Sequence, residues 1–348
     1  MSTAPSRNFA GDPGRPPHEI ALAMTDESAP LGKMPNFAGT PAVALVTCRA
    51  ARNLDADLPL LRTAFAAAGG CAEIVDWDDG GIDWSRFDLA LLRSAWDYTE
   101  RLRQFLAWVE RTAAGTLLLN PVPVVRWNSD KHYLLELARA QLSVVPTHIA
   151  EAGRSARPVL EEFLSLHDAA ELVVKPAVGA GSRDARRHSR SAIPEILAHM
   201  QPLLDAGRSA VLQPYLESVD REGESALMFI DGRLSHAIRK GPLLPAGAPA
   251  TAALFAPELI EPRAPRADEI AVAERVMAGL PFDTLLYGRV DLIRDRHGRP
   301  CVLELELTEP SLYLSFEPGS AQRFAAAALK RLASSKAGHQ GSCSAAFM

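Results

Sequence analysis

Three acidic residues on two neighbouring predicted strands carry the clearest chemical signal in this sequence. Residues 287–294 and 300–307 are apolar runs on either side of an Asp-Arg-His-Gly turn, which predicts an antiparallel pair. Alternate strand residues share a face, so Glu304 and Glu306 point the same way and Asp291 can join them. Such oxygen ligands suit Mg²⁺, which keeps positions open for phosphate oxygens. The alternative is a solvated charged face, but such a face normally includes lysine, and these strands contain none.

A lysine before a glycine-rich turn is the second candidate. Residues 172–178 predict a strand, and the backbone N–H groups of the turn after it can cover phosphate oxygens while the lysine ammonium binds another. The segment is not a Walker A motif, because GxxxxGK[ST] occurs nowhere, and Asp184 replaces the third glycine of GxGxxG. The structural alternative is a surface turn beside a lysine that extends into solvent. The residues assigned to the phosphates are Lys175, Gly179, Ala180, Gly181 and Ser182.

A strand that runs into a proline-bearing connection is the third candidate. Residues 210–216 predict this strand, and its end is formed by Gln213, Pro214, Tyr215 and Leu216. Backbone groups of such a connection can read the edge of an adenine ring. Glu224 follows closely enough along the chain to bind ribose hydroxyls. Taken alone, the segment is also an ordinary strand end.

Three basic residues complete the candidate site. Lys131 falls in the first turn of a helix predicted over residues 130–141, where a positive charge opposes the helix dipole. A nearby phosphate would offset that cost, whereas capping alone explains the residues before it. Arg289 stands two residues before Asp291 and can stabilise an oxyanion that develops on an attacked carbonyl. Lys240 ends a further predicted strand.

The elements that must position these residues fall into three segments of an α/β, in part α+β, protein. Residues 41–125 alternate short apolar strands with helices, which predicts a parallel α/β domain. Residues 126–215 predict a small α+β domain, and residues 216–335 predict a domain built on antiparallel strands. Ligands of parallel sheets bind at the carboxyl ends of the strands. The substrate-binding candidates at those ends are Thr47, Arg93, Ser94 and Asp97.

Both ends of the chain and one loop lack this patterning. Residues 1–40 are rich in proline and glycine without periodicity, so we expect a disordered leader. Residues 336–348 are expected to be a disordered tail. Residues 241–265 are rich in proline and alanine, which predicts a mobile loop.

Composition excludes several classes of protein. The net charge of −5 over 348 residues provides no overall basic field for nucleic acid or an anionic membrane. No apolar run approaches the roughly 20 residues that cross a bilayer. The four cysteines are far apart and form no CxxC pair, so neither a zinc site nor a disulfide framework is expected. We therefore expect a cytoplasmic protein that binds neither nucleic acid nor membrane.

The order of these pieces resembles the ATP-grasp superfamily. The resemblance implies a parallel pre-grasp domain, a small central lid domain and an antiparallel-sheet grasp domain, with ATP and Mg²⁺ as cofactors. Lys131 and Lys175 match the two nucleotide lysines, and residues 179–182 match the phosphate-covering loop. The residues that match the magnesium ligands are Asp291, Glu304 and Glu306. The last of these is most often asparagine in the family, and a carboxylate there keeps an oxygen ligand.

The same resemblance implies roles for the other candidates. Residues 213–216 match the adenine hinge, and Glu224 matches the ribose carboxylate. Arg289 resembles the arginine that stabilises the tetrahedral intermediate, and Lys240 is taken with it as catalytic. Selection of the substrate is assigned to the candidates of the first domain together with Ser311.

Three phrases carry a closer resemblance over about residues 41–335. They are LLRSAWDY at 91–98, RWNSDK at 126–131 and LELELTEPS at 303–311, and they look like the O-ureido-D-serine cyclo-ligases of D-cycloserine biosynthesis and their relatives. This family implies an ADP-forming ligase that joins a carboxylate to an amine through an acyl phosphate, acts on a small amino-acid-like substrate, and can form a homodimer. A small-molecule kinase and a non-catalytic nucleotide-binding regulator remain the alternatives.

Overall fold

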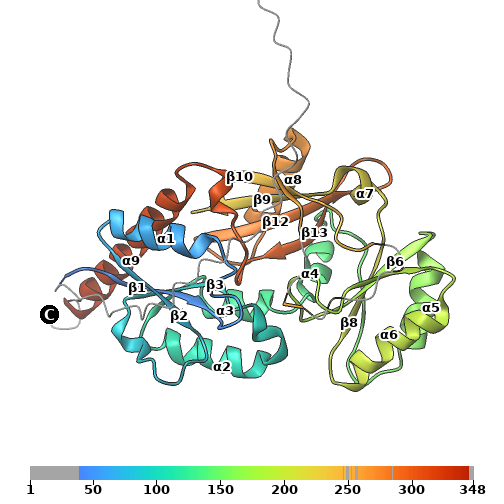
Figure 1. Cartoon of the computed structure of the whole chain (residues 1–348), viewed down its shortest axis with the longest axis horizontal. Helices are drawn as coiled ribbons and strands as arrows, with labels where there is room; N and C mark the ends of the chain where they lie inside the picture. The colour runs from blue at the N-terminus through green and yellow to red at the C-terminus, as the bar shows by residue number, and fades with distance from the viewer. Residues whose placement is uncertain are drawn as a thin grey trace, which may run out of the picture. The chain divides into compact units, whose positions relative to one another are not determined.

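The computed structural model describes residues 39–245, 247, 251, 253–254, 258–283 and 285–344, without the side chains of 338–344 (Figure 1). The predicted leader over residues 1–40 lies outside the described residues except for its last two. Within the part of the chain that is described, no helix is both long and apolar enough to cross a membrane.

The first segment forms a four-stranded parallel sheet, as the sequence predicted. Its strands are β1 (Ala42–Thr47), β2 (Cys71–Asp76), β3 (Leu89–Ser94) and β4 (Leu117–Leu119), in the spatial order β2-β1-β3-β4. Successive residues of each strand point to opposite faces of the sheet, so they pack into two different hydrophobic cores. Leu45 and Leu91 pack on one face, and Val46 and Leu92 pack on the other. The central strands are therefore covered on both sides.

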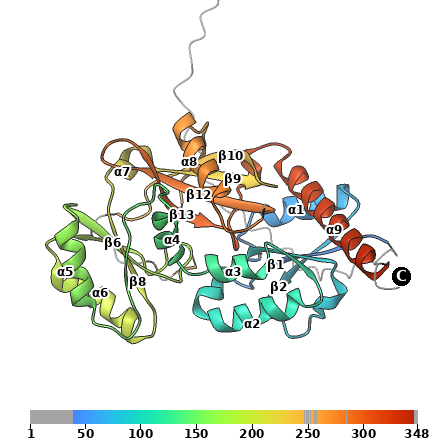
Figure 2. The same ribbon diagram turned by 180° about the vertical axis from the view of Figure 1, so that it is seen from behind.

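Helices cover the two faces of this sheet. Figure 2 shows α2 (Leu102–Ala113) and α3 (Val122–Asn128) on one side, where Phe105 and Trp108 of α2 fill the core. On the other side, α1 (Asp57–Ala67) lies beside the C-terminal helix α9 (Ser320–Ser344). Two short 3₁₀ turns lie in the connections: η1 (Trp84–Arg86) between β2 and β3, and η2 (Trp96–Glu100) between β3 and α2.

The end of the chain differs from the prediction. Residues 336–348 were expected to be a disordered tail, but α9 continues to Ser344, and only the last four residues lie outside the description. The segment lacks an amphipathic pattern, which is why the sequence did not indicate a helix. Lys336, Ala337 and Gln340 have high helix propensity, whereas Gly338 and Gly341 do not, so the segment continues a helix that packing of its earlier turns has already nucleated.

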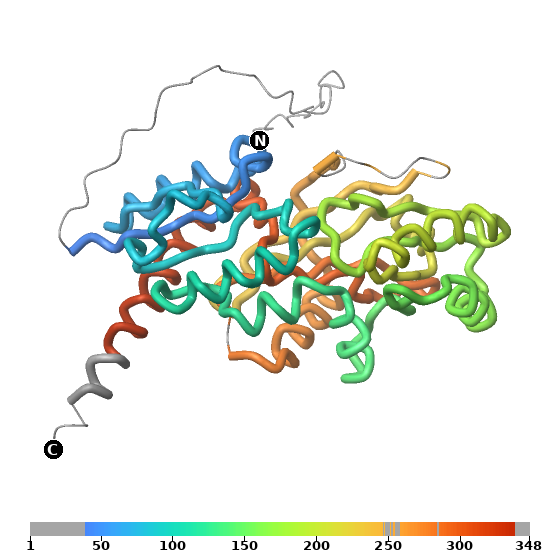
Figure 3. The backbone as a smooth tube through the Cα atoms, turned by 90° about the horizontal axis from the view of Figure 1, so that it is seen from below, coloured from blue at the N-terminus to red at the C-terminus, as the bar shows by residue number. Residues whose placement is uncertain are grey.

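The middle segment forms a separate antiparallel sheet. Its strands are β5 (His148–Ala150), β6 (Glu171–Pro176), β7 (Arg186–Ser189) and β8 (Ala210–Pro214), in the order β5-β8-β6-β7. Figure 3 shows α5 (Ala156–Leu166) and α6 (Ile193–Asp205) side by side against it. Phe163 and Met200 of these helices share a core with Val174 of β6. Lys175 lies on that strand directly before the glycine-rich turn.

The last segment contains a five-stranded antiparallel sheet in the order β11-β10-β9-β12-β13. The strands are β9 (Glu224–Ile230), β10 (Arg233–Lys240), β11 (Ile260–Pro262), β12 (Tyr287–Arg294) and β13 (Pro300–Glu306). Its helices are α7 (Ser218–Glu222) and α8 (Ala267–Ala278), with the turn η3 (Leu314–Phe316), and α4 (Tyr133–Arg139) of the middle segment packs against the same sheet. The predicted loop over 241–265 contains the edge strand β11, which the sequence did not indicate, and lies partly outside the described residues.

The register of β12 and β13 decides which side chains share a face. Arg289 pairs with Glu306, and Asp291 pairs with Glu304. The register then shifts, because Leu292 pairs with Val302 and leaves one residue of β13 between the two pairs. Leu292 and Val302 face the core beneath the sheet with α4 and α8. The charged residues are consequently directed to the opposite face, as the sequence predicted.

A turn between α3 and α4 corrects the helix predicted over residues 130–141. The first helix ends at Asn128 and the second begins at Tyr133, so Lys131 stands in the turn rather than in a first helical turn. The Asn128 side chain accepts from Leu307 N at 2.6 Å and donates to Leu305 O at 2.8 Å, which draws the turn against β13. These contacts join residues far apart in sequence and could not be read from local periodicity.

Candidate active site

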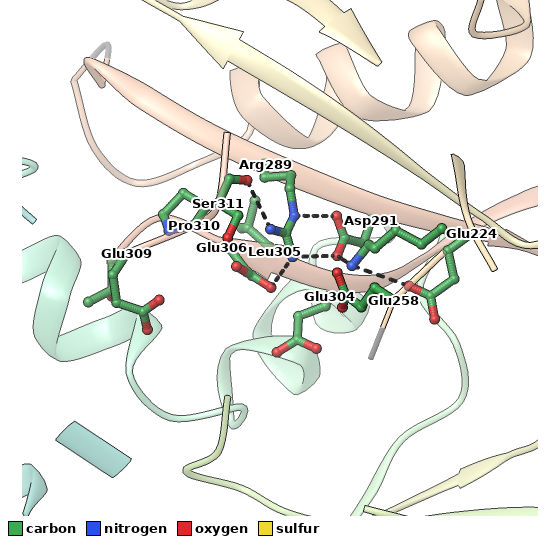
Figure 4. Close-up of polar contacts among 12 residues, drawn as sticks. Glu224, Glu258, Arg289, Asp291, Glu304, Leu305, Glu306, Glu309, Pro310 and Ser311 are labelled. Carbon is green, nitrogen blue, oxygen red and sulfur yellow. Dashed lines mark hydrogen bonds and ion pairs between the residues drawn. The ribbon is translucent and has the colours of Figure 1, made fainter. Parts of the chain in front are cut away.

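Four basic side chains meet three carboxylates on one largely buried face of β12 and β13, opposite the apolar core with α4 and α8, and we call this group the charged cluster. Its members are Lys131, Lys175, Lys240, Arg289, Asp291, Glu304 and Glu306. Figure 4 shows the Arg289 guanidinium between the carboxylates of Asp291 and Glu306. All seven were candidates from the sequence. The face that appeared purely acidic along β13 is therefore neutralised by cations from other elements.

Asp291 is the most enclosed carboxylate of the charged cluster. It accepts from Lys240 Nζ at 2.6 Å and from Arg289 Nε and Nη2 at 2.8 and 2.9 Å. Burial disfavours its charged form, but Arg289 and then Lys240 outweigh burial and lower the pKa of Asp291 to about 2. Burial and Arg289 disfavour the charge on Lys240, yet Asp291 and Glu224 keep the pKa of Lys240 well above its usual value.

Glu304 connects the two lysines that the sequence assigned to the nucleotide. Its carboxylate lies 2.8 Å from Lys131 Nζ and 3.8 Å from Lys175 Nζ. These two cations overcome the effect of burial and lower the pKa of Glu304. Burial is the main cause that lowers the pKa of Lys175, with Glu304 opposing it and Lys131 adding to it. Both lysines therefore already face a negatively charged oxygen.

Among the residues that the structure describes, Arg289 is the one basic side chain that pairs with Glu306, and Glu306 shares it with Asp291. Burial raises the pKa of Glu306 to about 8, because Arg289 only partly offsets burial and the neighbouring Asp291 and Glu304 carboxylates repel a further negative charge. A cation of higher charge at this face would favour ionisation of all three carboxylates.

The donor chemistry of these carboxylates fits Mg²⁺, but their arrangement in this structure is an ion-pair network. Within the described residues, no group of three or more acidic, histidine or cysteine side chains is placed to hold a metal ion. Each carboxylate instead turns toward a basic side chain, because like charges in a partly buried site separate. The ligand roles of Asp291, Glu304 and Glu306 therefore stay predictions.

The glycine-rich turn lies between β6 and β7, as predicted. Lys131 Nζ donates to Gly179 O at 2.6 Å, so this turn contacts the charged cluster directly. The turn closes on itself, since Arg183 N donates to Ala180 O. Gly181 and Ser182 have φ values of +61° and +59°, and the first of these left-handed positions favours glycine. The backbone N–H groups of residues 179–182 are the ones that the phosphate-binding prediction uses.

The predicted adenine hinge follows β8. Gln213 Nε2 donates to Thr147 Oγ1 at 2.9 Å, whereas the buried Gln213 Oε1 has no hydrogen-bond partner. Pro214 ends the strand, and Tyr215 N is bonded to Glu171 O at 2.9 Å. Leu216 begins the connection to α7. An orphaned buried acceptor beside a strand end fits a hydrogen-bond donor on a base edge.

Glu224, the predicted ribose ligand, begins β9 and is buried. Its carboxylate lies 3.4 Å from Lys240 Nζ. Burial raises the pKa of Glu224, and the neighbouring Asp291 adds to this effect although Lys240 opposes it. The structure thus joins Glu224 to the charged cluster through Lys240, a contact that the sequence did not indicate.

The five predicted substrate-binding residues separate into two groups. Thr47 and Ser94 are fully buried and share a hydroxyl hydrogen bond of 2.8 Å, and Asp97 accepts from Trp77 Nε1 at 2.8 Å and pairs with Arg101. None of these three contacts the charged cluster. Arg93 donates to Pro310 O, and Ser311 O accepts from Arg289 Nη1 at 3.0 Å. The second group therefore borders the cluster through residues 310–311.

Three residues near the site were not selected from the sequence. Asp57 accepts from the backbone N–H groups of Leu312 and Leu314 at 2.8 Å each, which fixes the loop after β13. In that loop Tyr313 has a φ of +49°, lies under the Arg289 guanidinium and donates to Glu258. The third is Glu309, inside the LELELTEPS phrase, and its place in that phrase was the available signal.

Comparison with known proteins gives consistent matches over most of the chain. The model of the D-cycloserine synthetase DcsG N-terminal domain matches residues 43–120. The cycloserine biosynthesis protein DcsG of Streptomyces lavendulae is 44% identical over 299 residues, which cover 83% of this chain and 98% of that protein.

Solved structures agree with this match. The crystal structure of D-cycloserine synthetase DcsG superposes with a TM-score of 0.79 at 42% identity, covering 84% of this chain and 99% of that one. The D-alanine–D-alanine ligase from Bacillus anthracis complexed with ATP superposes at 0.60 with 12% identity, covering 86% and 99%. The RimK domain ATP-grasp protein from Sphaerobacter thermophilus superposes at 0.57 with 19% identity, covering 83% and 99%. The last two show the fold alone. The chain has the ATP-grasp fold and belongs to the family of the D-cycloserine synthetase DcsG.

Proposed function

We propose that this protein is an ATP-dependent ligase that joins the carboxylate of a small amino acid to an amine-type nitrogen and releases ADP and phosphate. The substrate class is an O-ureido-D-serine-like amino acid, and the reaction is ring closure within one molecule. The name of its relative, a cycloserine biosynthesis protein, supports a place in antibiotic-type small-molecule biosynthesis. The mechanism that we assign proceeds through an acyl phosphate.

One observation carries this proposal, the meeting of predicted nucleotide lysines and predicted metal carboxylates at Glu304. Lys131 comes from the α3–α4 turn and Lys175 from β6, and both face the Glu304 carboxylate on β13. Three separate segments therefore bring opposite charges to one point. A triphosphate can replace Glu304 as the anionic partner of the lysines, which would release the carboxylate to bind a cation.

Bound Mg-ATP supplies an electrophilic γ-phosphoryl group and charge neutralisation, and the chain supplies the positions. Lys131 and Lys175 bind phosphate oxygens, and the turn over residues 179–182 covers others with its N–H groups. The metal would be held by Asp291, Glu304 and Glu306. Arg289 lies between the carboxylates of Asp291 and Glu306, and its place beside these metal-ligand candidates supports the role that we assign to it, stabilising an oxyanion on the attacked carbonyl.

The base and the ribose are assigned to the hinge. Gln213 and the backbone of residues 214–216 accept and donate at the base edge, and Glu224 binds ribose hydroxyls. The Glu224 carboxylate lies 3.4 Å from Lys240 Nζ, a longer contact than the 2.6 Å between Lys240 and Asp291. A ribose hydroxyl can therefore compete with Lys240 for the Glu224 oxygens. Lys240 then stays paired with Asp291 and holds that carboxylate in its ionised form.

Trapping with hydroxylamine tests this function. The protein is incubated with Mg-ATP, hydroxylamine and O-ureido-D-serine, with D-serine and L-serine in parallel. ADP and a hydroxamate that appear together, and only with the amino acid, would support the ligase. A stable phosphoester would indicate a kinase instead, and AMP release would contradict an acyl phosphate. Glu304→Gln serves as the inactive variant, and Glu73→Gln, an exposed residue of β2 paired with Arg86, serves as the matched control.

We place the reaction in the cytoplasm, where the three described cysteines would stay as the free thiols found here. The partner is a small molecule, and assembly into a homodimer remains a prediction. Size-exclusion chromatography with light scattering measures that assembly directly.

A further inference from the structure

Glu309 is a buried carboxylate beside the charged cluster that has no basic partner. Glu309 is only 7% exposed to solvent. Each carboxylate of the cluster contacts a lysine or an arginine, whereas no basic side chain among the described residues forms an ion pair with Glu309. Figure 4 shows Glu309 apart from the Arg289 contacts, next to Pro310 and Ser311. A buried carboxylate is costly unless a cation or several donors compensate it.

The surrounding contacts hold Glu309 in place. Trp96 Nε1 donates to the Glu309 carbonyl oxygen at 3.2 Å, and the fully buried Arg93 donates to the carbonyl of Pro310. The buried Tyr98 hydroxyl is hydrogen-bonded to the Glu309 carboxylate. These three partners come from β3 and η2 of the first segment. The carboxylate is therefore preorganised, because its backbone is fixed on both sides of the side chain.

These donors do not neutralise the carboxylate. Burial raises the pKa of Glu309 to about 7, although the Tyr98 hydrogen bond, Arg289 and Lys131 all oppose burial. Arg289 and Lys131 therefore act on Glu309 from nearby without pairing with it. The charge of the Glu309 carboxylate is therefore only partly compensated, because Lys131 is paired with Glu304 and Arg289 with Asp291.

We propose that Glu309 binds the ammonium group of the amino-acid substrate, an inference that rests on the proposed function. The ammonium and the carboxylate of an amino acid are attached to one carbon, so their binding groups must be neighbours in the protein. Arg289 lies on the side where the substrate carboxylate is proposed to react, and its charge acts on Glu309, which has no basic partner among the described residues. A bound ammonium would supply the cation that this buried carboxylate lacks.

This assignment also accounts for the choice of nucleophile. In an O-ureido-D-serine-like substrate a ureido nitrogen can close a ring on the activated carboxylate of its own molecule, whereas the α-amine, attached to the adjacent carbon, could attack only the activated carboxylate of a second molecule. An ammonium held by Glu309 keeps its proton and has no lone pair to donate. The ureido nitrogen, which needs no such proton loss at neutral pH, is then the group that closes the ring.

Comparing two substrates tests the role of Glu309. The kcat/KM for ADP release is measured with O-ureido-D-serine and with 3-(ureidooxy)propanoate, which lacks the α-amine. We expect the wild type to prefer the amino compound. Glu309→Gln should lower kcat/KM for the amino compound by about 10- to 100-fold, the usual cost of losing a charged hydrogen bond, and leave the value for the deamino compound unchanged.

Stability and nucleotide binding separate this role from a structural one. Gln matches Glu in shape and keeps the Tyr98 contact, so the Tm of Glu309→Gln should equal or exceed that of the wild type, and ADP affinity should not change. Glu161→Gln, an exposed residue of α5, is the matched control. Wild-type turnover with an unchanged substrate preference in Glu309→Gln would overturn this assignment alone. Absence of amino-acid-dependent ADP release by the wild type would overturn both the proposed function and this assignment.

Discussion

The Nζ atom of Lys240 lies 2.6 Å from the Oδ2 atom of Asp291, and both side chains are almost fully buried. Arg289 binds the same carboxylate with two nitrogens. Two cations thus face one anion, and the one excess positive charge is shared by the Glu224 and Glu306 carboxylates, whose pKa values are both raised. The pair sits at the centre of the sheet face on which the reaction is proposed to occur, so it contributes to both stability and chemistry.

Replacement of Lys240 by Met should lower the free energy of unfolding by about 3 kcal/mol, because Glu224 would be left buried without its basic partner. Turnover should also be lost, since Asp291 would then depend on Arg289 alone. Urea unfolding followed by circular dichroism measures the first effect. The double variant Lys240→Met with Glu224→Gln should be more stable than the single variant. Equal stability of Lys240→Met and the wild type would contradict the pairing.

Replacement of Glu304 by Gln should have opposite effects on nucleotide binding and on turnover. The variant keeps the shape of the side chain but frees Lys131 and Lys175 from a competing anion. Binding of ATP in the presence of EDTA should therefore become tighter, whereas Mg-dependent turnover should fall at least about 100-fold. Calorimetric titration measures the first and ADP release the second. A variant with wild-type turnover would exclude Glu304 as a metal ligand.

Two glycines with similar φ values should respond very differently to alanine. Gly207 has a φ of +76° and a Cβ there would meet nothing within 4 Å, so Gly207→Ala should cost about 1 kcal/mol of strain. Gly223 has a φ of +71°, and its Cβ would lie 2.3 Å from the carbonyl oxygen of Lys240. Gly223→Ala should therefore cost about 3 kcal/mol or more. Similar unfolding midpoints for the two variants in urea would contradict this close approach.

Acid should destabilise the protein through His188 of β7. Burial, followed by the charges of His199 and Arg186, lowers the pKa of His188 from 6.5 to about 4, with Glu195 opposing. Above pH 6.5 neither state binds this proton. As the pH falls from 6.5 toward 4, only the unfolded chain takes it up, so up to about 3 kcal/mol of stability is lost.

The variant His188→Gln should flatten this dependence, because the amide does not titrate and still donates toward His199 Nδ1, 3.0 Å from the native ring nitrogen. Tm measured from pH 7.5 to pH 4.5 provides the comparison. The exposed His297→Gln in the β12–β13 turn is the control and should follow the wild type. If the Tm of His188→Gln falls with decreasing pH as steeply as that of the wild type, groups other than His188 cause the loss of stability in acid.

Local patterning was sufficient to predict the elements that carry the site. The apolar run at 43–47 became β1 of a parallel sheet, and the alternation in residues 287–306 placed Asp291, Glu304 and Glu306 on one face. These predictions succeed because side-chain alternation along a strand is a local property of the backbone. Helix boundaries were less predictable. The helix predicted over 130–141 spans only Tyr133–Arg139, because residues 129–132 form a turn after α3, whose Asn128 bonds to β13.

The sequence by itself determined the fold family, the order of the segments and the identity of the charged residues. The tertiary structure decided their partners. It brought Lys240 to Asp291, both predicted lysines to Glu304, and Glu309 to a buried position without a basic neighbour. It also placed Thr47 and Ser94 in a hydrogen bond with each other rather than beside the charged cluster. The physical reason is that ion pairing and burial depend on distances between residues remote in the chain, which no periodicity within a strand or helix encodes.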